Sequence, residues 1–382
     1  MSKLKFKILK QKWNARVWEI ELNGVTVQTP IFMPVWTKAT IKWLFLELLK
    51  NKGILWDLEP IKLILANTFH LYLRPGDELI KKAGWLHKFE NWEDGLILTD
   101  SWWFQVFSLW LWKKDEANRP NKHNNSEHQV DIKLVEDGVY FRSPYDGSKH
   151  FFSPEKVVDI QCNFGSDIMM MLDVCSPAGV DKKTYKEHMH TTHKRAKMAY
   201  DHFIKKYDET RWVLFPIVQW GTDKDLRLES LTYLSQFATD WIAVWWVSVW
   251  EGRDLIREIV EFTVPKLPND KPRYLMGVWT PEDLTHAIEY GTDMFDCVLA
   301  TRLWRHWVAF SDNGNINLSN AKYREDFTPL DNTVAGCLPY TKAYIHHLLK
   351  EKEILGWTIL SLHNILYLHR LLQEWKIKFL ED

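Results

Sequence analysis

The sequence is poor in cysteine, glycine and long apolar runs, and it carries almost no net charge. Its four cysteines are too few and too scattered for a disulfide framework, so we expect a reducing, cytoplasmic location. No run approaches the roughly 18 apolar residues that a membrane span needs, and the start MSKLKFKILK lacks the apolar stretch of a signal peptide. A formal net charge of −1 excludes a uniformly basic protein, so any nucleic-acid contact requires a local basic patch.

The scarcity of glycine is matched by an excess of tryptophan. The chain has 16 glycines and 22 tryptophans in 382 residues, whereas glycine alone usually makes up about 7% of a globular protein. Many tryptophans occur where turn chemistry calls for glycine, in the segments DSWWFQ, IVQWG, AVWWVSVWEG, MGVWTP and RLWRHW. With 46% apolar residues, the chain can nevertheless bury a sizeable core.

Eight short apolar runs alternate with helix-like amphipathic stretches. The runs cover residues 27–35, 61–69, 95–101, 166–174, 212–219, 241–249, 273–278 and 294–300. Near-continuous apolar strands that alternate with helices favour a parallel sheet covered on both faces. Eight such units predict an α/β fold, a closed (β/α)8 TIM barrel over residues 1–310.

Two insertions and a C-terminal subdomain complete the predicted organisation. Residues 113–130 are polar and aperiodic, which indicates a mobile loop. Residues 138–153 are typical of a β-hairpin that turns at Asp146 and Gly147. Residues 311–382 lose the barrel pattern and predict a small helical subdomain packed on the barrel.

Polar side chains fall repeatedly at the ends of the apolar runs. They are Asn67, Asp100, Asp173, Gln219 and Asp296. A single acid in this position is usually a helix cap. Five polar residues in the same position favour an active site, because the carboxyl ends of barrel strands converge on one mouth.

Several of these residues lie in motifs that resemble those of bacterial tRNA-guanine transglycosylases, in family order over about residues 15–370. The motifs include LANTFHLYLRPG, LTDSWWFQVFSL, GSDIMMMLDVCSP, PRYLMGV and DMFDCVLATR. The resemblance implies exchange of the wobble guanine in tRNAs with a G-U-N anticodon for 7-aminomethyl-7-deazaguanine, a step of queuosine biosynthesis. It also implies a homodimer and a reaction that requires no cofactor.

The chemistry of base exchange explains the acids. An N-glycosidic bond breaks through an oxocarbenium-like transition state, and a carboxylate that attacks the anomeric carbon can hold the sugar covalently. The resemblance assigns this nucleophile to Asp296 and the general acid/base to Asp100. It also implies that Asn67 orients the nucleophile.

The resemblance further assigns a pocket for the extruded base. Asp173 would accept hydrogen bonds from guanine N1–H and the exocyclic amine, and Gln219 would contact the base carbonyl. Phe104 and Met276 would sandwich the base, although both are equally suited to plain core packing. The other predicted base contacts are Trp246, Val247, Cys175 and Val249, of which Cys175 and Val249 resemble the bacterial pair that accepts the 7-aminomethyl group.

For the tRNA anticodon loop, Arg302 and Arg305 match the residues that contact the uridines flanking the target guanine. The guanidinium fork suits both phosphate and base edges. Two alternatives stay open. A non-catalytic tRNA-binding paralogue is disfavoured because Asp100 and Asp296 are both present, and an unrelated barrel glycosidase is disfavoured by the base-reading pair Asp173 and Gln219.

The sequence departs from the family at its structural zinc site, which consists of three cysteines and one histidine. Cys337 and His363 match the last cysteine and the histidine, but Asn332 and Val334 stand at the other two cysteine positions. Two ligands cannot close a tetrahedral structural site. We therefore expect no bound zinc.

The second departure is the tryptophan excess. Nine tryptophans stand at family glycine positions, namely Trp102, Trp103, Trp220, Trp245, Trp246, Trp250, Trp279, Trp304 and Trp307. Trp18, Trp36, Trp43 and Trp85 follow the same pattern, whereas Trp92 is a family tryptophan. Overpacking costs about 1–3 kcal/mol per site, so a dozen such changes would exceed the 5–15 kcal/mol that stabilises a domain. We hypothesise that UGA codons meaning glycine are written here as tryptophan, and that the literal chain folds poorly.

Overall fold

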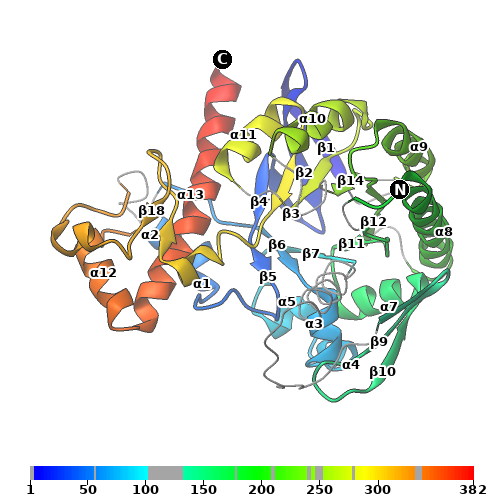
Figure 1. The fold of residues 1–382 in the computed structure, drawn as a ribbon, viewed down its shortest axis with the longest axis horizontal. Coiled ribbons are helices and arrows are strands. Elements are labelled where there is room, and N and C mark those ends of the chain that lie inside the picture. The colour runs from blue at the N-terminus through cyan, green and yellow to red at the C-terminus, as the bar shows by residue number, and fades with distance from the viewer. Residues whose placement is uncertain are drawn as a thin grey trace.

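The computed structural model describes residues 4–55, 57–101, 132–176, 179–207, 211–238, 242–245, 253–277, 280–331 and 338–382. Two five-stranded parallel sheets form its centre, with the strand orders β12-β11-β7-β6-β5 and β13-β14-β15-β16-β4 (Figure 1). The strands are β4 (Ile31–Met33), β5 (Val35–Trp36), β6 (Leu63–Ala66), β7 (Leu96–Thr99), β11 (Ile168–Met170), β12 (Val213–Phe215), β13 (Ile217–Val218), β14 (Ile242–Trp245), β15 (Arg273–Met276) and β16 (Met294–Asp296). Each of the eight predicted runs contains one or two of them.

The chain passes directly from one sheet to the other at two places, which are at the edges of both sheets. Only Pro34 separates β4 from β5, and only Pro216 separates β12 from β13. A proline has no N–H to donate, so each interrupts the ladder, but its carbonyl still accepts from the neighbouring strand. Pro34 O accepts from Leu65 N at 3.1 Å, and Pro216 O accepts from Ala243 N at 3.0 Å. The predicted parallel α/β architecture is confirmed, although its strands are assigned to two sheets and not to one closed barrel.

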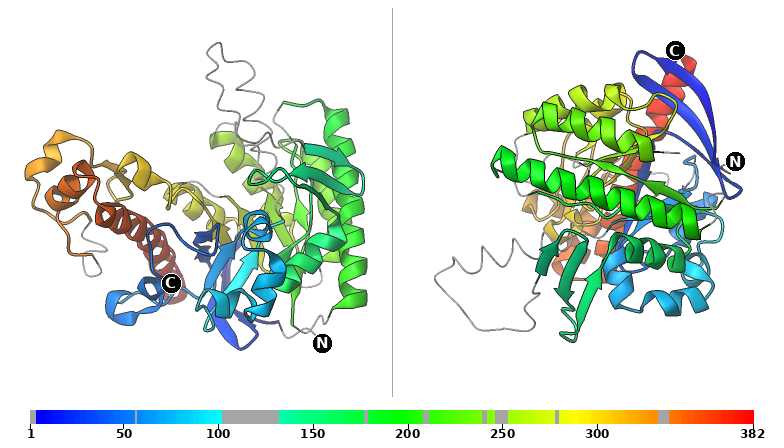
Figure 2. Two further views of the ribbon diagram at one scale, coloured as in Figure 1. Left: turned by 90° about the horizontal axis from the view of Figure 1, so that it is seen from below. Right: turned by 90° about the vertical axis from the view of Figure 1, so that its right-hand side faces the viewer.

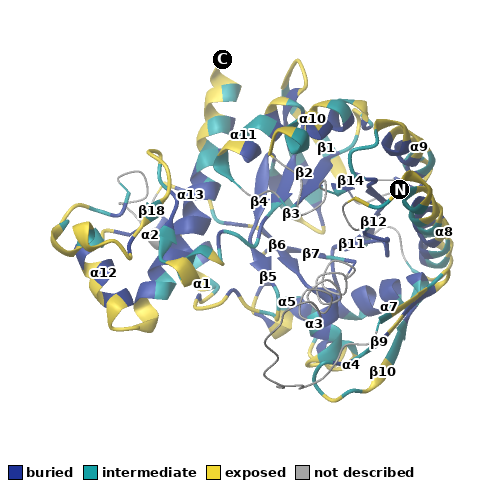
Figure 3. Ribbon diagram, in the orientation of Figure 1, coloured by how far each residue is buried: buried dark blue, intermediate teal, exposed yellow. Residues whose placement is uncertain are grey.

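Both faces of these strands are buried, which explains their near-continuous apolar sequences. Met33, Leu65, Leu98 and Met170 pack in one apolar cluster with Tyr274. Their sequence neighbours Phe32, Ile64, Ile97 and Met169 belong to a second cluster, which includes residues of the surrounding helices. Side chains of a strand alternate between its two faces, so one cluster lies between the sheets and the other lies beneath the helices (Figure 3).

The helices around the strands follow the expected alternation. In the described part of the chain they are α1 (Glu47–Lys50), α2 (Lys52–Leu55), α3 (Thr68–Leu73), α4 (Asp77–Lys82), α5 (Trp85–Phe89), α7 (Pro154–Phe164), α8 (Lys182–Lys206), α9 (Lys224–Leu234), α10 (Arg253–Thr263) and α11 (Pro281–Glu289). The longer ones begin at side-chain caps, for example Ser153 before α7, Asp181 before α8 and Thr280 before α11.

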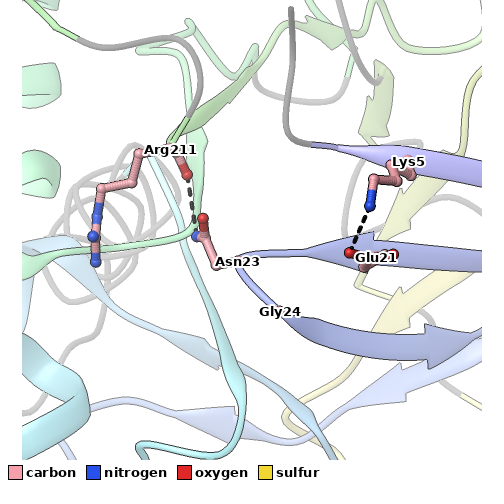
Figure 4. A pocket seen from close by; sticks show the side chains of 5 residues that line it. All are labelled: Lys5, Glu21, Asn23, Gly24 and Arg211. Carbon is pink, nitrogen blue, oxygen red and sulfur yellow. Dashed lines mark hydrogen bonds and ion pairs between the residues drawn. The ribbon is translucent and has the colours of Figure 1, made fainter.

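An N-terminal antiparallel sheet was not predicted. It consists of β1 (Lys5–Lys12), β2 (Ala15–Leu22) and β3 (Val25–Gln28), and it covers the end where the parallel strands begin. Buried Arg16 anchors it, because Arg16 Nη2 donates to Asp293 Oδ2 at 2.6 Å just before β16. A pocket of about 490 Å³ at this end is lined by Lys5, Glu21, Asn23, Gly24 and Arg211 (Figure 4). It lies at the opposite end from the carboxyl termini of the strands.

The predicted β-hairpin is confirmed. β9 (Gly138–Arg142) pairs antiparallel with β10 (Lys149–Phe152), and Asp146 and Gly147 lie in the connection between them. Gly147 has a φ of +71°, which the turn requires and glycine adopts without strain. A third strand, β8 (Ile132–Val135), pairs with β9. The predicted mobile loop 113–130 lies outside the described residues.

The C-terminal region contains the predicted helices as α12 (Lys342–Lys350) and α13 (Ile354–Glu381) (Figure 2). It has a small apolar core of its own, which includes Leu318, Leu330, Ile345, Leu349 and Leu360. Residues farther along α13, such as Ile365 and Leu372, pack instead in the cluster beneath the barrel helices. The domain boundary at residue 310 stays a prediction. No helix of the described residues is both long and apolar enough to cross a membrane.

The tryptophans concentrate at backbone conformations that favour glycine. Among the described residues, nine non-glycine residues have positive φ, and five of them are tryptophan: Trp13, Trp43, Trp85, Trp220 and Trp307. The indole N–H groups of Trp18, Trp36, Trp220 and Trp304 are buried without a hydrogen-bond partner. By contrast, Trp92 has no positive φ, and its Nε1 donates to Leu96 O at 3.2 Å. Trp92 therefore has neither the positive φ nor the unbonded indole that mark these other tryptophans.

Candidate active site

Asp100 and Asn67 lie at the carboxyl ends of the adjacent strands β7 and β6. Asn67 Nδ2 donates to Asp100 Oδ2 at 2.6 Å, and the backbone N–H of Thr68 donates to Asp100 Oδ1 at 3.0 Å. Asn67 also caps α3, because its Oδ1 accepts from His70 N at 3.0 Å. The amide of Asn67 therefore holds Asp100, the candidate general acid/base, and its role in orienting Asp296 stays a prediction.

Asp296 is held by a residue that the sequence analysis missed. Tyr274 OH donates to Asp296 Oδ1 at 2.6 Å, and the N–H of Gly277 donates to the same oxygen at 2.8 Å. Burial raises the pKa of Asp296, and these two donors oppose that shift. Gly277 has a φ of +74°, which aims its N–H at the carboxylate without side-chain strain. The motif PRYLMGV contains both donors, so it was the available signal for Tyr274.

Tyr274 links the two candidate catalytic acids. Burial raises the pKa of its phenol well above the usual value, and the charges of Asp296 and Asp100 raise it further. A carboxylate shifts a phenol in this way only when it lies close to it. Asp100 follows β7 and Asp296 ends β16, so both acids lie at the carboxyl ends of parallel strands, as their positions in the sequence predicted.

Asp173 and Gln219 form the buried polar pair that was predicted to read the base. Gln219 Nε2 donates to Asp173 Oδ2, and Ser101 Oγ donates to Asp173 Oδ1 at 2.7 Å. Burial raises the pKa of Asp173 to about 6, although these hydrogen bonds and the charge of Arg195 act in the opposite direction. Buried Arg195 of α8 also donates to the backbone oxygen of Asp173 at 3.2 Å, a role that sequence alone did not indicate.

The recess beside this pair is almost filled. Its lining consists of Cys175, Ser176, Tyr185, Gln219, Trp220, Gly221 and Trp245. The free space is about 10 Å³, roughly what one water molecule needs. Trp220 is 1% exposed and has a φ of 101°. Two of the predicted glycine positions, 220 and 245, therefore place indoles in the candidate base pocket.

The remaining predicted base contacts divide between described and undescribed residues. Met276 ends β15, is buried, and packs with Met33 and Tyr274. Cys175 is buried in the lining of the recess, and burial raises the pKa of its thiol. Phe104, Trp246, Val247 and Val249 lie outside the described residues, so the base sandwich and the 7-substituent pocket stay predictions.

Arg302 and Arg305 are exposed beyond β16, on either side of the start of a short 3-10 helix (Leu303–His306). Exposed Lys42 lies near both of them. Burial and then the positive charges of Arg305, Lys38 and Arg302 lower the pKa of Lys42. The charges of the two predicted arginines and of Lys38 therefore all act on Lys42, and the sequence analysis selected neither lysine.

Of the residues at the family's zinc ligand positions, only His363 lies within the described residues. His363 is fully buried in α13; its Nε2 donates to Phe310 O at 2.8 Å, while its Nδ1 has no hydrogen-bond partner. Cys337, Asn332 and Val334 lie outside the described residues. Among the residues that are described, no group of three or more His, Cys, Asp or Glu side chains could hold a metal ion. One histidine does not make a zinc site, and the expected absence of zinc stays a prediction.

Comparison with known proteins agrees with this arrangement. The family model described as queuine tRNA-ribosyltransferase matches residues 11–382. The chain belongs to this family. A queuine tRNA-ribosyltransferase of Caldanaerobacter subterraneus subsp. tengcongensis is 44% identical over 98% of this chain and 93% of its own length. The corresponding protein of Vibrio campbellii is 41% identical over 100% of this chain and 93% of its own length.

Membership of the queuine tRNA-ribosyltransferase family extends over nearly the whole chain, including the C-terminal helices. Another relative, from Thermoanaerobacter pseudethanolicus, is 42% identical over 98% of this chain. Neither the paralogue alternative nor the glycosidase alternative receives support from these comparisons.

Proposed function

We propose that this chain is a tRNA-guanine transglycosylase that replaces the wobble guanine of G-U-N anticodons with 7-aminomethyl-7-deazaguanine in queuosine biosynthesis. The observation that carries the proposal is the convergence of four polar residues at one end of the parallel sheets. Tyr274 donates to Asp296, Asn67 donates to Asp100, and Asp173 with Gln219 forms a buried pair connected to Asp100 through its neighbour Ser101.

Asp296 acts as the nucleophile in this proposal. Its Oδ1 accepts from Tyr274 and Gly277, while its Oδ2 takes no hydrogen bond from the described residues. Oδ2 attacks the anomeric carbon of the ribose as the bond to guanine breaks, and the bonding electron pair leaves with the base. The two donors stabilise the carboxylate, which must be deprotonated to attack.

Asp100 manages the protons of the two bases. In the first half of the reaction it supplies a proton to the departing guanine, and in the second half it takes one from the entering 7-deazaguanine, whose nitrogen then displaces Asp296. Asn67 and Thr68 fix the position of Asp100. Two displacements at one carbon retain its configuration and give ping-pong kinetics.

Asp173 and Gln219 select the base. A carboxylate accepts from both guanine N1–H and the exocyclic amine, whereas the amide of Gln219 donates to the carbonyl. In the free chain these two side chains satisfy one another, so a base replaces their mutual hydrogen bond on entry. The preference for the 7-aminomethyl group rests on Cys175 and Val249.

We also propose that the two parallel sheets form one (β/α)8 barrel, which is supported by the eight strand positions and by the continuity across Pro34 and Pro216. The homodimer and the cytoplasmic location follow from the resemblance and from the low cysteine content. Sedimentation of the purified chain tests the dimer.

Trapping of the covalent intermediate tests the reaction. The experiment uses a variant with glycine at the nine family glycine positions, here called the nine-glycine chain, because indoles fill the recess of the printed sequence. Incubation with a G-U-N tRNA should give an adduct that survives a denaturing gel, and Asp296→Asn should abolish both adduct and guanine exchange. Exchange without any adduct would refute the covalent mechanism, and absence of exchange would refute the function.

A further inference from the structure

Tyr145 lies between two exposed cations that the proposed function has not used. Arg74 Cζ lies 3.9 Å from the centroid of the Tyr145 ring, and Lys38 Nζ lies 5.6 Å from it. Arg74 and Lys38 are exposed, and Tyr145 is half-buried. Within the described residues, neither cation pairs with a carboxylate. Two exposed cations that approach one ring and form no ion pair with a described carboxylate favour the binding of an anion.

The connection that carries Tyr145 is fixed by its own hydrogen bonds. Ser143 N donates to Ser148 O at 2.8 Å, and Gly147 N donates to Ser143 O at 2.9 Å. The neighbouring carboxylate of Asp146 accepts from Ser148 Oγ at 2.7 Å. Tyr145 is therefore presented by a defined turn, and Asp146 already has a partner on that turn.

The cluster of Lys38, Arg74 and Tyr145 lies next to the candidate active site. Arg74 ends α3, whose first cap is Asn67, the residue that holds Asp100. Seven residues separate Asn67 from Arg74, which corresponds to about 10 Å along a helix. Lys38 follows β5 at the same end of the sheets, and its charge, after burial, helps to lower the pKa of His70 on α3 to about 4.

Lys38 also continues the basic group around Arg302. Its charge acts on Lys42 together with those of Arg305 and Arg302. Lys38 and Arg74 approach the same Tyr145 ring, and the charge of Lys38 also acts on Lys42. Exposed cations of this kind suit a polyanion such as a nucleic-acid backbone.

We propose that Lys38 and Arg74, positioned by Tyr145, bind the phosphodiester backbone of the tRNA anticodon arm beside the extruded nucleotide. The proposal rests on the proposed function for the identity of the RNA. Backbone contacts fix the register of a nucleic acid without reading its sequence. The cluster would therefore place the ribose at Asp296, whereas Asp173 and Gln219 select the base.

The test measures equilibrium binding of the full-length chain to a transcribed G-U-N tRNA over a range of salt concentrations. The double variant Lys38→Gln/Arg74→Gln should bind roughly tenfold more weakly, and the slope of log K against log salt should fall by about 1.4, since each lost contact to a single strand removes about 0.7. The matched control is Lys7→Gln/Lys12→Gln, which removes two exposed charges from β1 at the opposite end.

Three outcomes separate this proposal from the function. An affinity and a salt slope equal to those of the control would overturn the backbone contact. The double variant should reduce the affinity for tRNAs with G34 and for tRNAs with A34 to the same degree. A loss of affinity confined to tRNAs with G34 would show that the two residues read the base instead. Tyr145→Phe should retain tight binding, whereas Tyr145→Leu should weaken it. Normal tRNA binding without guanine exchange by the nine-glycine chain would count against the function alone.

Discussion

Replacing Trp220 by glycine should leave the stability nearly unchanged, whereas the same replacement of Trp92 should be severely destabilising. The two residues are matched in burial, at 1% and 0% exposure. They differ in backbone and in hydrogen bonding. Trp220 has a φ of 101° and a buried indole N–H without a partner. Trp92 has no positive φ and donates to Leu96 O.

The expected magnitudes follow from these differences. Removing a buried tryptophan costs about 3–5 kcal/mol through lost packing at either position. At position 220 the change also relieves about 1–3 kcal/mol of backbone strain and a further 1–3 kcal/mol from the unbonded N–H. At position 92 nothing is relieved, and the carbonyl of Leu96 loses its partner. Trp92→Gly should therefore lower the free energy of unfolding by about 2–6 kcal/mol more than Trp220→Gly.

Equilibrium urea denaturation, followed by far-UV circular dichroism, measures both changes. Glycine adds the same flexibility to the unfolded chain in both variants, so that term cancels in the comparison. Equal losses of stability at the two positions would refute the reasoning that position 220 is a glycine site.

Three further predictions concern the site and the gene. Elemental analysis of the dialysed protein should find no stoichiometric zinc; one zinc per chain would show that ligands outside the described residues complete the site at His363. In the nine-glycine chain, the KM for guanine should fall as the pH rises through about 6, because Asp173 must lose its proton to accept from the base. The raised pKa of Asp173 affects stability in the opposite direction. It stabilises the fold below about pH 4, and that contribution is lost as the pH rises through 6. A KM independent of pH between 5 and 7 would argue against Asp173 as the base acceptor. The codons for Trp220 and Trp307 should be UGA and that for Trp92 should be UGG, which sequencing of the gene decides.

The fold was largely predictable because its main signal is repeated. Each parallel strand buries both faces, so the sequence shows short apolar runs without alternation, and all eight runs contain a strand. The N-terminal sheet was missed because its first strand, KFKILKQK, is mostly exposed, and an irregularity between Ile8 and Lys10 breaks the alternation of its lysines. The splitting of two strands was also not foreseen. Pro34 and Pro216 interrupt the ladder within single apolar runs, which a pattern of hydrophobicity does not register.

The acids of the candidate site were predictable from the sequence, but the residues that hold them in position were not. Asp100, Asp173 and Asp296 stand out because it is unusual for several apolar strands of one chain each to be followed by an acid. Tyr274 and Arg195 do not stand out, since Tyr274 reads as a strand residue and Arg195 as one of many charges on α8. The hydrogen bond from Asn67 to Asp100 was not predicted, because spacing along the chain does not show which of two acids a side chain reaches.

The tryptophan hypothesis now has two physical signals that do not depend on family resemblance. One is backbone conformation, since Trp43, Trp85, Trp220 and Trp307 have positive φ, as does Trp13, which the sequence comparison had not selected. The other is hydrogen bonding of the indole, since Trp18, Trp36 and Trp304 have ordinary φ but buried indole N–H groups without a partner, as does Trp212, which the sequence comparison had not selected.

These signals arise from different requirements of glycine. Positive φ marks a turn that a side chain strains, whereas an unbonded indole marks a space in which glycine let the backbone approach its neighbours closely. Trp220 meets both criteria and also fills the candidate base recess. Tryptophan at a turn alone would reduce the stability and leave the reaction unaffected. Tryptophan at position 220 also prevents the base from entering its recess. Stability and guanine exchange should therefore be restored by different subsets of the glycine substitutions, with position 220 acting mainly on exchange.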